Sequence, residues 1–77
     1  MKFQITGEHI DLNKLLKAAA LLESGGIAGE IIKAGEVLVD GNIETRKRKK
    51  IYPGSVVSIP QLNESVEVES SEANSGN

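Results

Sequence analysis

The feature that most constrains the fold is a pair of apolar patterns with helical spacing, separated by Ser24-Gly25-Gly26. The first pattern predicts a helix that begins after Asp11, a residue type that caps helix N-termini well. Its apolar residues fall on one helical face, whereas Lys14 and Lys17 fall off that face. These apolar residues are Leu12, Leu15, Leu16, Ala19 and Leu22.

The second pattern predicts a second, short helix after Ser24-Gly25-Gly26, with the Ser24 hydroxyl as a capping group. Its apolar residues are Ile27, Ala28, Ile31 and Ile32. Gly35 follows at a position where a left-handed backbone ends many helices, so we expect this helix to stop near Ala34. The two helices would therefore be joined by a tight turn and pack together.

Alternating apolar residues predict strands before and after this helix pair. A short N-terminal strand is expected around Phe3 and Ile5, and another at 37–39 leads into Asp40-Gly41-Asn42, which favours a hairpin turn. Pro53-Gly54 predicts a second turn before a strand at 56–59, and residues 65–69 would add a final edge strand. The expected fold is α+β, with a short N-terminal strand and two packed helices followed by a small antiparallel sheet.

Length and composition limit how this fold is stabilised. The chain has 77 residues and no cysteine, so apolar packing must hold one small domain, which we assign to residues 1–69. Residues 70–77 have one Ala and no larger apolar side chain, and we predict a disordered polar and acidic tail. The longest apolar run, residues 18–22, is far shorter than the ~20 residues of a membrane-spanning helix. We therefore expect a soluble, cytoplasmic protein that does not bind membranes.

The charges are unevenly distributed. Residues 1–60 contain all nine Lys and Arg with seven acids, whereas residues 61–77 contain four acids and no cation, which together give the net charge of −2. Five of the cations are consecutive and form what we call the basic run, residues 46–50: Arg46, Lys47, Arg48, Lys49 and Lys50. Strict strand alternation would bury Lys47 and Lys49 unpaired, so the basic run should loop outward. Adjacent cations of this kind can bind several phosphates together.

Other chemistry finds little support in the sequence. His9 is the one histidine, and we assign it no catalytic or metal-binding role because no acid, base or ligand cluster accompanies it. The glycines at 25–29 follow a helix and lack the lysine of a nucleotide-binding loop. Phe3 is the one phenylalanine, Tyr52 is the one tyrosine, and there is no tryptophan. Aromatic side chains on which nucleobases could stack are therefore almost absent. We expect no enzyme activity, no cofactor and no metal.

The order of these elements resembles the RNA-binding domain of the S4 family, also called the alpha-L motif, over residues 11–59. The most specific segment is Gly35-x-Val37-x-Val39-Asp40-Gly41, and the overall look is most similar to short stand-alone bacterial members. The other matching residues are Leu12, Leu15, Leu16, Ser24, Ala28, Ile31, Ile32, Gly54, Ser55, Val56 and Val57.

The resemblance implies binding of structured RNA, often ribosomal or transfer RNA, through the helix pair and the nearby hairpin loop. Where the family often has Arg, this chain has Asp11 and Gly25, so we expect affinity to depend more on the basic run. Lys14, Lys17 and Lys33 are secondary candidates for phosphate contacts. The alternative is a protein-interaction adaptor on a ribonucleoprotein assembly, with the acidic tail or an edge strand as its surface.

Overall fold

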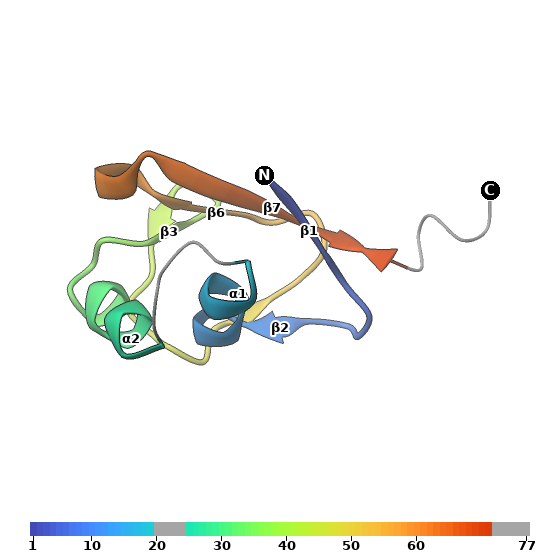
Figure 1. Ribbon diagram of the computed structural model, residues 1–77, viewed down its shortest axis with the longest axis horizontal. Coiled ribbons are helices and arrows are strands. Elements are labelled where there is room, and N and C mark those ends of the chain that lie inside the picture. Colours follow the sequence, from blue (N-terminus) through green and yellow to red (C-terminus); the bar gives the residue numbers. More distant parts are fainter. Residues whose placement is uncertain (20–24, 72–77) are drawn as a thin grey trace.

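A five-stranded sheet forms one layer of the protein, and two helices with a two-stranded sheet form the other (Figure 1). This computed structural model describes residues 1–19 and 25–71. The expected α+β class is confirmed, with the two helices packed against each other on one face of the large sheet.

Helix α1 (Leu12–Ala18) forms where the helical spacing predicted it. Helix α2 (Gly25–Lys33) has the predicted apolar residues but begins at Gly25, so the two glycines expected in the turn before it lie in its first turn. The exposed fraction is zero for Leu12, Leu15 and Leu16 in α1 and for Ala28 and Ile32 in α2. The predicted roles of Leu22 and Ser24 fall on residues outside the described ranges.

Helix α2 ends as expected just before Gly35, whose φ of +78° is left-handed. The Gly35 N–H donates to the Ile32 carbonyl at 3.1 Å, and the Glu36 N–H donates to the Ile31 carbonyl at 3.0 Å. This pair of bonds is the Schellman arrangement, which satisfies carbonyl oxygens that the end of the helix leaves free.

The large sheet has the strand order β1-β7-β6-β3-β4. Its strands are β1 (Lys2–Ile5), β3 (Leu38–Val39), β4 (Asn42–Ile43), β6 (Val56–Ile59) and β7 (Glu64–Ser70), with a 3-10 turn, η1 (Pro60–Leu62), before β7. The pairs β3–β4, β3–β6 and β6–β7 are antiparallel, as expected. Strand β1 instead pairs parallel to β7, which makes the sheet mixed.

The prediction that residues 65–69 form an edge strand is wrong. Strand β7 lies between β1 and β6, with Phe3 of β1 opposite Val68, and the edges of the sheet are β1 and β4. The alternation of apolar and polar residues in β7 is compatible with an edge or a central position in the sheet. It specifies which side chains are buried and not which strands lie alongside. Its Val66 and Val68 are fully buried.

The turn between β3 and β4 is a primed turn, as predicted. Asp40 and Gly41 have φ values of +51° and +86°. The Asp40 carboxylate also accepts the Val56 N–H at 2.8 Å and the Ser55 hydroxyl at 3.1 Å. Asp40 therefore fastens the hairpin to the start of β6.

The small sheet joins β2 (Ile10–Asp11) to β5 (Lys50–Ile51) in antiparallel register, Ile10 opposite Ile51 and Asp11 opposite Lys50. Ile51 is only 1% exposed and connects this sheet to the common core. The core side chains are Ile5, Leu12, Leu15, Leu16, Ala19, Ala28, Ile32, Val37, Val39, Ile51, Val57, Ile59, Val66 and Val68.

Strand β7 continues through Ser70, one residue into the segment predicted as a tail. Disorder of the tail remains a prediction, since residues 72–77 are outside the described ranges. In residues 1–19 and 25–71, no helix is long and apolar enough to cross a membrane.

Candidate nucleic-acid interface

The basic run forms a loop that is fixed to the start of α1 by its backbone. The Leu12 N–H donates to the Lys49 carbonyl at 2.9 Å, and the Asn13 N–H donates to the Lys47 carbonyl at 3.0 Å. These N–H groups belong to the first turn of α1, where no carbonyl of the helix itself is available. Asp11 occupies the N-cap position as predicted, but its side chain makes no capping hydrogen bond. The basic run therefore caps the helix with its own carbonyl oxygens.

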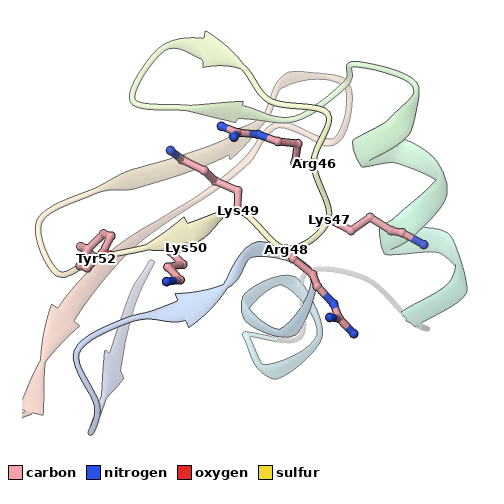
Figure 2. Close-up of a pocket in the computed structure, with 6 residues that line it drawn as sticks. All are labelled: Arg46, Lys47, Arg48, Lys49, Lys50 and Tyr52. Carbon is pink, nitrogen blue, oxygen red and sulfur yellow. The ribbon is translucent and has the colours of Figure 1, made fainter.

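The side chains of the basic run spread outward from this anchored backbone, as predicted (Figure 2). All are exposed except Lys49, which is half-buried, and only Lys50 lies in a strand. They line an open depression of about 680 Å³ together with Tyr52. Phosphate oxygens approaching this depression would meet several cations without any movement of the backbone.

One of the five cations is already paired. The Glu44 carboxylate accepts hydrogen bonds from Arg46 at its backbone N–H (2.9 Å), Nε (2.9 Å) and a terminal guanidinium nitrogen (3.2 Å). These bonds, the side-chain ones foremost, lower the pKa of Glu44 from 4.5 to about 2, and the pairing raises the pKa of Arg46. Glu44 thus holds the base of the loop and neutralises much of the charge of Arg46.

Lys47 lies across helix α2 instead of extending freely into solvent. Figure 2 shows its side chain directed toward that helix. A Cβ atom added to Gly29 would lie only 3.1 Å from Cδ of Lys47 and 3.8 Å from its Nζ. The missing side chain at position 29 therefore leaves the space in which the stem of Lys47 packs.

Comparison with known proteins decides the family of this chain. The sequence profile of the S4 domain matches residues 3–69. The chain belongs to the S4 domain family. The resemblance noted over residues 11–59 is confirmed, and the match also includes β1 and β7 apart from their outermost residues, Lys2 and Ser70.

Two relatives of this S4 domain protein are similar over most of their length. An Escherichia coli (strain K12) protein named "Putative RNA-binding protein YbcJ" is 50% identical over 50 residues, or 65% of this chain and 71% of that protein. A Bacillus subtilis (strain 168) protein named "Probable ribosome maturation protein RlbA" is 40% identical over 55 residues, or 71% of this chain and 78% of that protein.

The secondary candidates of this S4 domain lie outside the depression. Lys14 and Lys17 are exposed on α1, and Lys33 is exposed at the end of α2. Lys14 follows Asn13, so it belongs to the helical turn that the basic run caps, whereas Lys17 and Lys33 lie in the last turns of their helices. The structure therefore brings together residues 46–50 and leaves Lys17 and Lys33 apart from them.

Besides the packing of Lys47 against Gly29, sequence reasoning missed two further features near the basic run of this S4 domain. Glu44 stands two residues before Arg46, a spacing of opposite charges that could have indicated their pairing in an extended segment. The second feature is a contact between His9 and Tyr52, whose ring centroids are 5.6 Å apart with an angle of 46° between the rings. Only the register between β2 and β5 could have indicated it. Across the described ranges, no group of three His, Cys, Asp or Glu side chains could hold a metal ion.

Proposed function

We propose that this S4 domain protein is a non-catalytic module that binds structured RNA, ribosomal or transfer RNA, mainly through the phosphate backbone. The observation that carries the proposal is the anchored basic run, which presents its cations around one open depression. Phosphate contacts of this kind give affinity and position, and base contacts give most of the sequence specificity.

Both relatives support this choice of partner. The E. coli relative is named as an RNA-binding protein, and the B. subtilis relative is named as a ribosome maturation protein. Ribosomal RNA is therefore the first RNA to test. A role of this kind would be carried out in the cytoplasm, where ribosomes and transfer RNA are found.

A binding role also agrees with the chemistry of the site. The lowered pKa of Glu44 is accounted for by its bonds to Arg46, so it does not indicate a proton-transfer group. Because Arg46 is paired, we expect four cations to dominate: Lys47, Arg48, Lys49 and Lys50. Four phosphate contacts predict a salt slope of about −2.8 to −3.6, or a loss of affinity of roughly 50- to 150-fold between 50 and 200 mM salt.

The test is a salt titration of binding to ribosomal RNA and to duplex DNA with two charge-matched double variants. Lys47→Gln with Arg48→Gln removes two charges from the depression, and Lys17→Gln with Lys33→Gln removes two charges from the helix ends. The first variant should reduce the steepness of the slope by about 1.4 to 1.8, and the second should leave it nearly unchanged. Equal losses would mean that RNA responds to the net charge alone and that the basic run is not the site.

A protein-interaction adaptor is the second candidate, and one observation favours it. Ile43 is 66% exposed on the edge strand β4, beside a smaller groove of about 220 Å³ that Leu38, Pro60 and Gln61 also line. Exposed strand edges with apolar side chains are a common site for partner strands. Absence of RNA binding, together with protein binding that persists at high salt and is lost on Ile43→Lys, would select this function.

A further inference from the structure

The contact between His9 and Tyr52 follows from the register of the small sheet. Ile10 lies opposite Ile51 and points into the core, so the next pair, His9 and Tyr52, lies on the other side of the small sheet with the two rings in tilted contact. Both residues are exposed, and Tyr52 is 50% exposed. The fold thus presents two adjacent rings on its surface.

Tyr52 also belongs to the depression of the basic run. It lines the same concavity as residues 46–50, and Figure 2 shows it beside Lys50. Lys50 and Tyr52 are two residues apart on an extended segment, so they share the outward face at a separation of about 7 Å. An aromatic ring and an ammonium group therefore stand side by side at one end of the cationic surface.

The ring of Tyr52 lies at the surface, outside the buried core. Its backbone carbonyl accepts the Ser55 N–H at 3.1 Å, but this bond does not depend on the side chain. Within the described ranges, the Tyr52 hydroxyl makes no hydrogen bond, and Tyr52 is not part of the buried core. A large ring that is half open to solvent, is supported by a second ring and lies beside cations has the features of a stacking surface for a base.

We propose that Tyr52, supported by His9, is a stacking platform for one unpaired nucleobase, with the phosphates of its neighbours bound by the basic run. This inference rests on the proposed RNA-binding function and adds a preference to it. Bases inside an A-form helix are stacked on each other, and side chains do not reach them through the narrow major groove, whereas a bulged or loop base can be turned out onto a ring. The protein should therefore prefer RNA helices that contain a bulged nucleotide.

The test compares two RNA hairpins that differ only in one bulged 2-aminopurine, which is a fluorescent base. Wild-type protein should bind the bulged hairpin more tightly than the fully paired one and should change the fluorescence of the bulged base. Tyr52→Leu keeps a side chain of apolar character but removes the ring, and it should weaken binding to the bulged hairpin by about 5- to 140-fold. Tyr52→Phe keeps the ring and should bind as wild type does.

The salt dependence separates this inference from the proposed function. Tyr52→Leu should lower affinity without changing the salt slope, because stacking releases no counterions. His9→Ala should cause a smaller loss on the bulged hairpin, since it removes only the supporting ring. A circular dichroism melt of each variant checks that the fold is retained, and Leu62→Ala, at another exposed apolar residue, is the control for loss of exposed apolar surface.

Each outcome decides one of the two proposals. If wild-type protein binds both hairpins equally and Tyr52→Leu binds as wild type does, RNA binding stands and the stacking platform is rejected. If Lys47→Gln with Arg48→Gln weakens binding to both hairpins and reduces the salt slope, while Tyr52→Leu loses only the preference for the bulge, both proposals are supported. If wild-type protein binds neither hairpin nor ribosomal RNA, both are overturned.

Discussion

The backbone N–H of Asn13 donates a 3.0 Å hydrogen bond to the carbonyl oxygen of Lys47, which joins the first turn of α1 to the basic run. A helix N-terminus is usually capped by a side chain, but here the capping group comes from a segment more than thirty residues away in sequence. The basic run is therefore anchored directly to the start of the helix pair.

This bond predicts slow hydrogen exchange at the start of α1. The first amides of a helix normally exchange quickly because they lack partners, but those of Leu12 and Asn13 should be protected. Insertion of two glycines between Arg48 and Lys49 should remove that protection while the Ala19 amide, bonded to the Leu15 carbonyl, keeps its own. Exchange measured by NMR would contradict the capping arrangement if both amides exchanged freely in the wild-type protein.

Removal of the Glu44 carboxylate should strengthen RNA binding at low salt. Glu44→Gln releases Arg46 from its bidentate pair, so a fifth cation becomes available to phosphate. The salt slope should then steepen by about 0.7 to 0.9. The double variant Glu44→Gln with Arg46→Gln is the control, and it should return the slope to the wild-type value. Weaker binding by Glu44→Gln at low salt would mean that Glu44 serves to orient Arg46 for binding.

Glu44 should also make stability depend on pH in the acid range. Its pKa is lowered from 4.5 to about 2 by the bonds to Arg46, so the folded state favours the ionised form. The stabilisation is fully present above pH 4.5 and is lost as the pH falls toward 2. Urea unfolding of wild type and Glu44→Gln should differ most near neutral pH and converge in strong acid. A difference that is constant over this range would exclude ionisation of Glu44 as its cause.

Local sequence patterns predicted the elements of this fold because each depends on nearby residues. The helical spacing of Leu12, Leu15 and Leu16, the left-handed end at Gly35 and the turn at 40–41 all act over a few positions, and the structure has all of them. The parallel pairing of β1 with β7 was missed because it joins residues more than sixty positions apart, for which alternation gives no partner.

The candidate site shows the same division. The sequence predicted that the five consecutive cations loop outward, because burial of unpaired charges costs much free energy. The sequence did not predict the packing of Lys47 against Gly29 or of His9 against Tyr52, because each contact joins elements that no local pattern relates. Strands β2 and β5 have two residues each, which is too short for a period-two signal in the sequence.

Asp40 should contribute to stability through two separate effects that substitutions can divide. Asp40→Ala removes the acceptors for Ser55 and Val56 and also the short polar group that lets Asp tolerate a φ of +51°, so we expect a loss of about 1 to 3 kcal/mol. Asp40→Gly removes the acceptors but relieves the backbone, and Asp40→Asn keeps an acceptor and tolerates the turn. Unfolding free energies should fall in the order wild type, Asn, Gly, Ala. Equal values for Ala and Gly would exclude the backbone effect.

Gly29 offers a way to move Lys47 without touching its charge. In Gly29→Ala the new Cβ would meet Lys47 Cδ at 3.1 Å, and the flexible lysine should shift away. The alanine itself favours the interior of α2 by about 0.5 to 1 kcal/mol over glycine. We therefore expect an unchanged or higher melting temperature together with weaker RNA binding. The double variant Gly29→Ala with Lys47→Ala provides the control, because the effect of Gly29→Ala on RNA affinity should vanish once Lys47 is absent. A loss of affinity that persists in the Lys47→Ala background would mean that α2 contacts the RNA near position 29 directly.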